Sequence, residues 1–265
     1  MSSKSLPPEI RNMIYEFSLI RPAGIHLVRK QELHWVKPSY FPWTGKDVRH
    51  SRTGRTRRDN ANDRVPVSFL RCCKRVHSEA RAIMYTNHFM VEDMGTLSVW
   101  LRGLGPDNIA HLQRIQIKCG PQQWDYASTR AGAKAQFGRY RVICQEVGKM
   151  IAVARNLESL QTMFYYHHEI KSLGSGLRRL DPVSAWIDLA RKVAELLYDD
   201  FRPFFLLGLS RGRTPEQLCR IVKIDMNNWR CLRKTLNPPW LSDTDAERAE
   251  SELVEHLRLL LEKNL

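Results

Sequence analysis

The pattern of apolar and polar positions predicts a short amphipathic helix at the start of the chain, over residues 6–20. Apolar side chains in this segment recur at spacings of four, four and three, which places them on one face of a helix. Pro7 and Pro8 suit the first helical turn, where a backbone N–H has no partner inside the helix, and Ser5 is a candidate N-cap. The apolar stripe of this helix consists of Leu6, Ile10, Ile14 and Phe17. It either packs into the core of the protein or faces a partner.

A second helical pattern begins after a long polar stretch and is expected to run from Pro66 to about Asn87. Its apolar residues recur at spacings of four, three, four and three, which predicts a buried stripe. The stripe consists of Phe69, Cys73, Val76, Ala80 and Ile83. A basic outer face consists of Arg71, Lys74, Arg75, Ser78 and Arg81. Because neither helix can bury its stripe alone, we expect the two helices to pack on each other.

Between these helices, short β-prone runs over residues 25–28 and 33–36 favour a hairpin, and residues 46–64 form a polar insertion. A third helix is expected over residues 97–104, where Gly105 and Pro106 end it. The expected N-terminal domain is therefore residues 1–105, with the basic insertion at 46–64.

After residue 105 the pattern alternates between short β-prone runs and longer helical segments. Strands are expected near residues 112–117, 157–163 and 218–224, and helices over residues 130–156 and from Asp181 until Pro203 stops the second one. Such alternation favours parallel strands covered by helices. The L-x-x-L/I starts of the strands resemble a leucine-rich repeat, but their unequal intervals indicate only degenerate repeat-like units. An acidic amphipathic helix ends the chain, with Leu253, Leu257, Leu260 and Leu261 on its apolar side.

These patterns predict the α+β class: N-terminal helices with a hairpin and a basic insertion, followed by a mixed α/β interaction domain over residues 106–265. Apolar residues make up 43% of the 265-residue chain, enough to build a sizeable core. No run of about 18 apolar residues is present, which argues against a membrane span. The N-terminus lacks the charged and then apolar pattern of a signal peptide. The expected location is intracellular, either nuclear or cytoplasmic.

The formal net charge of +14 favours acidic partners, whether nucleic acid, an anionic membrane face or an acidic protein surface. Residues 46–64 contribute seven basic and three acidic side chains, so they are the most polar part of the chain. Candidate contacts to nucleic acid or to an acidic partner within this insertion are Arg49, Arg52, Arg55, Arg57 and Arg58. A plain solvated basic surface is the alternative.

No pattern in the sequence predicts catalysis, a cofactor or a metal site. The serine-hydrolase, phosphate-loop and zinc-protease motifs are absent, and the six cysteines include no C-x-x-C pair. His167, His168 and Glu169 are metal-ligand types, but neighbouring residues on a strand point to opposite faces. We therefore expect no catalytic residues, no metal and no cofactor.

Two segments carry a resemblance to a known family. Residues 6–19, LPPEIRNMIYEFSL, resemble the opening of an F-box, and residues 69–85, FLRCCKRVHSEARAIMY, contain the pattern L-R-x-C-x-x-x-x-x-E-A. Together they are similar to a large group of fungal F-box-like proteins, over roughly residues 5–105. The resemblance implies docking to the adaptor subunit of a cullin–RING ubiquitin ligase, while the rest of the chain recruits a substrate. The partner-binding residues that it implies are Leu6, Pro7, Ile10, Ile14 and Phe17.

The leading hypothesis is that the protein is a non-catalytic protein-interaction adaptor, which would serve as a substrate receptor in a ubiquitin ligase complex. The alternative is a basic nucleic-acid-binding or scaffold protein that uses Arg49 to Arg58 and the outer face of the second helix. In the first hypothesis, Leu6 and Pro7 precede the first complete turn and should be accessible. Ile10 and Ile14 should be shared with the core.

Overall fold

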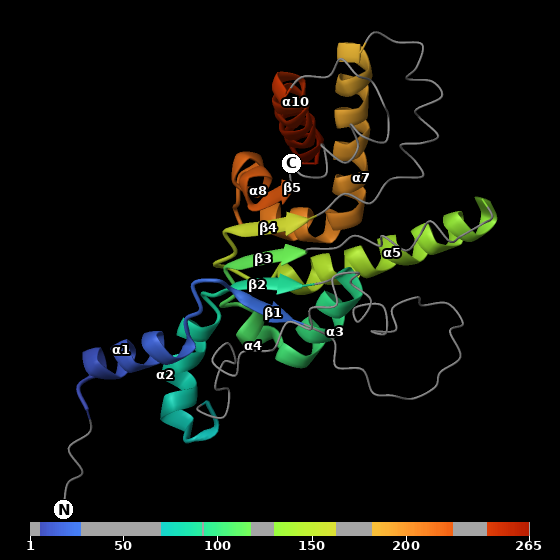
Figure 1. Cartoon of the computed structure of the whole chain (residues 1–265). Helices are drawn as coiled ribbons and strands as arrows, with labels where there is room; N and C mark the ends of the chain where they lie inside the picture. Colours follow the sequence, from blue (N-terminus) through green and yellow to red (C-terminus); the bar gives the residue numbers. More distant parts are fainter. Residues whose placement is uncertain are drawn as a thin grey trace, which may run out of the picture. The chain divides into compact units, whose positions relative to one another are not determined.

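The computed structural model of the chain describes residues 6–27, 70–91, 93–117, 130–162, 182–224 and 243–264 (Figure 1). Within these residues it forms eight helices and five strands, which confirms a mixed α+β fold. The chain divides into two compact units, Met1–Met90 and Val91–Leu265, whereas the pattern along the sequence places the division after residue 105. Each unit is described by itself.

The first unit is built on two helices, α1 (Pro8–Leu19) and α2 (Lys74–Met84), with strand β1 (Ile25–Leu27) and most of β2 (His88–Val91). The turn between α1 and β1 depends on Gly24, whose φ is 81°. A Cβ atom there would lie 2.7 Å from the carbonyl oxygen of His88, so only glycine fits without a shift. The second run of the expected hairpin lies outside the described residues.

The second unit contains three short parallel strands, β3 (Arg114–Ile117), β4 (Ser159–Thr162) and β5 (Val222–Ile224). In their register Ile115 pairs with Leu160, and Leu160 pairs with Val222. Helices α3 (Met94–Leu104) and α4 (Pro106–Ile109) precede β3, and α5 (Arg130–Ile151) connects β3 to β4. This arrangement confirms the expected parallel pairing through helical crossovers.

The predicted strand start at Leu218 is wrong, because residues 215–221 form helix α8 (Pro215–Ile221) and the strand begins only at Val222. The local cause is a capping box. The side chain of Thr214 accepts from the backbone N–H of Gln217 at 3.3 Å, and the Gln217 side chain accepts from the N–H of Thr214 at 2.9 Å. Pro215 at the first helical position adds to this helix start.

The prediction that a helix ends at Pro203 is confirmed in part: α7 (Pro182–Ser210) consists of two helical segments that meet at a kink, with non-helical angles at Phe201. Proline has no N–H, so Pro203 leaves the carbonyl of Asp199 without its usual helical donor. The side chain of Gln145 on α5 donates to that carbonyl at 3.3 Å. A second contact from α5 lies next to it, between Arg141 Nε and the buried Asp200 Oδ1 at 3.1 Å.

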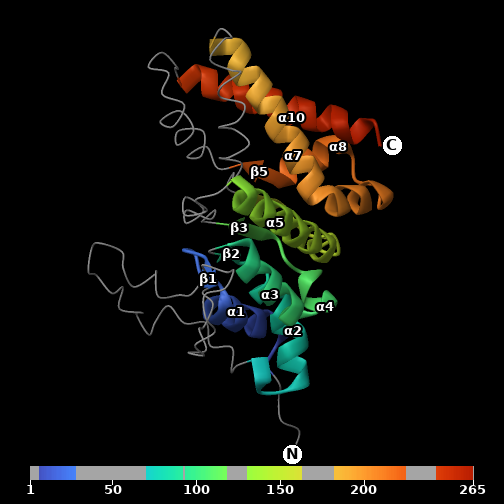
Figure 2. The same ribbon diagram turned by 90° about the vertical axis from the view of Figure 1, so that its right-hand side faces the viewer.

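The C-terminal helix α10 (Asp243–Glu262) packs against α7 in the second unit (Figure 2). Three of its four predicted apolar residues, Leu253, Leu257 and Leu261, are buried, and Leu260 is partly buried. An ion pair of 2.8 Å between Arg191 on α7 and Glu252 also joins the two helices. The predicted amphipathic helix is therefore confirmed, and its apolar side contributes to the core.

Candidate protein-interaction surface

The helices α1 and α2 pack on each other, as their patterns predict. Tyr15 and Leu19 of α1 are 2% and 0% exposed, and they share a small core with the fully buried Ala80 of α2. Val76 and Ile83 of α2 are partly buried against this core. The buried face of α1 is thus carried by Tyr15 and Leu19, which lie one helical turn apart.

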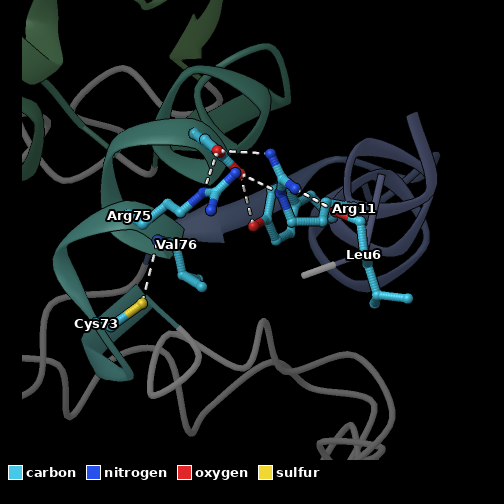
Figure 3. Close-up of polar contacts among 7 residues, drawn as sticks. Leu6, Arg11, Cys73, Arg75 and Val76 are labelled. Atoms are coloured by element: carbon cyan, nitrogen blue, oxygen red, sulfur yellow. Dashed lines mark hydrogen bonds and ion pairs between the residues drawn. The ribbon is translucent and has the colours of Figure 1, made fainter. Parts of the chain in front are cut away.

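A polar cluster holds the two helices in this orientation (Figure 3). Arg11 donates two hydrogen bonds to the carboxylate of Glu79, at 2.9 and 3.0 Å, and Arg75 donates a third at 3.0 Å. The hydroxyl of Tyr15 donates to the same carboxylate at 3.0 Å. These donors, Arg11 first, lower the pKa of Glu79 to about 2, while burial raises the pKa of Tyr15. Glu79 therefore stays ionised at neutral pH and accepts from both helices.

The C-terminal end of α1 is held by Asn87, which is 3% exposed. Its amide donates to the backbone carbonyls of Leu19 at 3.0 Å and Met84 at 2.6 Å. Its side-chain oxygen accepts from the backbone N–H of Arg21 at 2.7 Å. One side chain thus satisfies backbone groups at the ends of both helices. Glu79 bonds to the middle of α1 and Asn87 to its C-terminal end, so the helix is held against α2 in one orientation about its own axis.

This orientation leaves the opposite face of α1 in solvent. Five apolar side chains on that face are between 40% exposed, at Ile14, and 90% exposed, at Phe17. We call them the exposed stripe, which consists of Leu6, Ile10, Met13, Ile14 and Phe17. Leu6 points away from the polar cluster in Figure 3.

The structure corrects two expectations about this helix. Ile10 and Ile14 are exposed rather than shared with the core, because Tyr15 and Leu19 occupy the contact with α2. The N-cap position is Pro7, which is exposed and provides no side-chain cap; Ser5 lies outside the described residues. The predicted stripe does not include Met13, although Met13 follows Ile10 by three positions and therefore lies on the same face.

The second motif segment has a different beginning from the one predicted. Helix α2 begins at Lys74, and Cys73 is its exposed N-cap, with a sulfur that accepts from the backbone N–H of Val76 at 3.5 Å. Cys73 therefore does not belong to the buried stripe, because it precedes the first helical turn. Phe69 and the predicted start at Pro66 lie outside the described residues. In the pattern L-R-x-C-x-x-x-x-x-E-A, cysteine caps the helix, Glu79 binds the polar donors and Ala80 packs against α1.

In the second unit, a cleft of about 730 Å³ lies between α8, β5 and α10. Val222, Leu253 and Val254 form apolar walls, and the sulfur of Cys219 donates to the carbonyl of Val254 at 3.9 Å. Burial raises the pKa of Cys219 to about 12 and also raises the pKa of Glu250. Burial thus favours the neutral thiol, which lines the cleft beside the apolar walls. The sequence does not reveal this cleft, because it joins segments that lie far apart in the chain.

The remaining predicted site residues have no described structure. Arg49, Arg52, Arg55, Arg57 and Arg58 lie outside the described residues, and so do His167, His168 and Glu169. Within the described part of the chain, no group of three or more His, Cys, Asp or Glu side chains is placed to hold a metal ion. None of the helices in that part is long and apolar enough to cross a bilayer.

The fold and this surface define a mixed helix-and-strand protein whose N-terminal helix pair presents an apolar stripe to solvent. The chain belongs to the family described as "Domain of unknown function (DUF7730)", whose model matches residues 3–173. The match covers both motif segments, the exposed stripe and the chain through β4. Neither a curated protein nor a solved structure matches the chain.

Proposed function

We propose that this protein is a non-catalytic protein-interaction adaptor that docks through the exposed stripe of α1. The partner that fits the F-box-like motifs is the adaptor subunit of a cullin–RING ubiquitin ligase, and the chain would serve as its substrate receptor. One observation carries the proposal: α1 has two apolar faces, and within the described residues one of them is buried while the other is exposed.

The exposed stripe has the properties of a docking surface. Contiguous exposed apolar side chains mark interaction sites more often than solitary ones do. The stripe follows one face of a helix at spacings of three and four, which is the pattern that inserts into an apolar groove of a partner. Phe17 is 90% exposed, so a partner that buries its ring would gain on the order of 2 kcal/mol or more from that side chain.

The polar contacts between α1 and the residues of and after α2 support the same proposal. Glu79 and Asn87 fix the helix before any partner arrives, so binding would not have to order it. A preorganised helix binds more tightly than one that must fold on binding, because the conformational entropy of the helix is already lost when the protein folds. Arg11 and Tyr15 thus act on the proposed surface only by positioning the helix.

The second unit supports the substrate-receptor part of the proposal as a compact, mixed α/β scaffold. Its cleft between α8, β5 and α10 offers apolar walls and charged rim residues of both signs, including Arg220, Lys223 and Glu250. These features suit the capture of a protein segment with an apolar side chain. The resemblance of the strands to degenerate leucine-rich repeats stays a prediction of the sequence.

A binding measurement with one matched control tests the proposal. The intact chain would be titrated with purified adaptor subunit of the ligase in a calorimeter. Phe17→Asp places a carboxylate on the exposed stripe, whereas Asn12→Asp places one on an exposed polar position of the same helix. We expect binding by the parent and by Asn12→Asp, and a loss of at least about tenfold for Phe17→Asp, the scale of a minor interface hot spot. Absence of binding by the parent chain would overturn the proposal.

A further inference from the structure

A second surface of the first unit lies on the side of α2 that faces away from α1. On α2, Lys74, Ser78 and Arg81 lie at spacings of four and three, which places these three side chains in one row. Arg71 lies just before the N-terminus of the helix and adds a fourth polar side chain, counted here with the row. Arg71, Lys74 and Ser78 are exposed, and Arg81 is partly exposed. We call this row the basic face.

The positive charge of the basic face is not neutralised within the described residues. Glu79 is the acidic residue of α2, and its carboxylate is turned toward α1, where Arg11, Arg75 and Tyr15 donate to it. No ion pair within the described parts of the chain involves Arg71, Lys74 or Arg81. The polar cluster therefore has a second consequence, because the carboxylate within α2 that could offset the basic face binds Arg11, Arg75 and Tyr15 instead.

We propose that the basic face binds the phosphate backbone of duplex nucleic acid. From Lys74 to Arg81 the row spans about 10 Å of helix axis, at 1.5 Å per residue. One strand of a duplex carries a negative charge about every 3.4 Å along its axis, so the row matches about three phosphates. The hydroxyl of Ser78 adds a hydrogen-bond donor between the cations, and the net charge of +14 attracts a polyanion at longer range.

The composition of the basic face favours a duplex over an acidic protein or a single strand. Protein interfaces depend on buried apolar and aromatic anchors, and this row contains neither. Single strands stack their bases on aromatic rings, and the row has no aromatic residue. The proposed contacts are to the phosphates, and phosphate contacts carry no sequence information of their own. This function is separate from docking through the exposed stripe.

The test is the salt dependence of binding to a fluorescent duplex of about 20 base pairs, measured by anisotropy with the full chain. The variant Arg71→Gln, Lys74→Gln, Arg81→Gln removes three cations from the basic face. The control Arg202→Gln, Arg248→Gln, Lys263→Gln removes the same residue types from exposed positions of the second unit. Both variants carry the same reduced net charge, so a difference between them reports on the position of the charges.

We expect the control to bind as the parent does and the basic-face variant to bind roughly a hundredfold more weakly at about 0.1 M salt. The slope of log affinity against log salt should fall in magnitude by about 2 to 3, because each phosphate contact contributes about 0.9. A charge-preserving variant, Arg71→Lys with Arg81→Lys, should keep the parent affinity. Equal loss in both glutamine variants, or loss in the lysine variant, would overturn the proposal. Displacement of the duplex by an equal charge concentration of polyglutamate would also overturn it, in favour of an acidic protein.

Discussion

Both α1 and α10 are amphipathic helices in the sequence pattern, but the predicted apolar side is buried in α10 and exposed to solvent in α1. Leu253, Leu257 and Leu261 of α10 are buried in the second unit, as their spacing predicts. The predicted stripe of α1 stays in solvent, and Tyr15 and Leu19 are buried in its place. Apolar periodicity therefore identifies a helix in both cases, but it identifies the buried face only in α10.

The difference has a physical cause in the polar contacts. The regularly spaced Leu253, Leu257 and Leu261 of α10 lie on one face, and burial of that face removes a continuous apolar stripe from water. Helix α1 has apolar residues on two faces, and the hydrogen bonds from Arg11 and Tyr15 to Glu79 select the face with Tyr15. A helix with a second, unused apolar face has that face available for a partner.

The largest expected effect is a difference in the free energy of unfolding between a charge placed on the buried face of α10 and one placed on the exposed stripe of α1. Leu257→Asp buries an unpaired carboxylate in the second unit and should lower the free energy of unfolding by several kcal/mol, on the order of 3 to 5. Phe17→Asp changes an exposed position and should alter it by no more than about 0.5 kcal/mol. Urea unfolding followed by circular dichroism measures both. Comparable losses for the two variants would show that the stripe of α1 is packed in solution.

A smaller loss of stability is expected from Asn87→Ala, which removes the side chain that bonds to both helix ends. The carbonyl of Leu19 would lose its donor in a buried environment, and the expected cost is about 1 to 3 kcal/mol. Hydrogen exchange measured by mass spectrometry should show faster exchange in the last turn of α1. Thr86→Ala removes a neighbouring hydroxyl that donates to the carbonyl of Ile83 within its own helix end, and it serves as the control.

The smallest expected effect is a change of stability with pH. It is small because the Glu79 cluster is partly open to solvent, which weakens its ion pairs. The pKa of Glu79 is lowered from 4.5 to about 2 by Arg11, Arg75 and Tyr15, so its contribution is complete above about pH 4.5. That contribution should be lost as the pH falls from 4.5 toward 2, when the carboxylate becomes protonated. The urea midpoint of the parent should therefore fall over this window more steeply than that of Glu79→Gln. Glu16→Gln changes an exposed carboxylate of α1 and should keep the slope of the parent.

Much of the fold follows from the sequence. The two N-terminal helices, their mutual packing, the parallel strands and the C-terminal helix are all predicted by apolar spacing. One error has a local cause: the capping box of Thr214 and Gln217 begins a helix where a strand was expected. This signal is visible in the sequence as T-x-x-Q before an apolar run. The helical segment that follows the break near Pro203 is not visible in this way, because the side chain that bonds to the carbonyl of Asp199 there is Gln145 of another helix.

The candidate surface is predictable only in part. The residues of the stripe are evident from their spacing, but their exposure depends on a carboxylate that lies 64 positions away from Tyr15 in the chain. No periodic pattern links such distant residues. Met13 was recoverable from its spacing to Ile10, whereas the cleft beside α10 required the three-dimensional arrangement.

The central claim is that the stripe of α1 is open in the free chain and covered by a partner. Met13 lies in the stripe and is 64% exposed, whereas Met94 is 2% exposed, so their oxidation by hydrogen peroxide reports on it directly. With mass-spectrometric detection, we predict fast oxidation of Met13 in the free chain, slow oxidation of Met94, and protection of Met13 by saturating adaptor subunit of the ligase. Oxidation of Met13 as slow as that of Met94 in the free chain, or as fast with the adaptor subunit as without it, would contradict the claim.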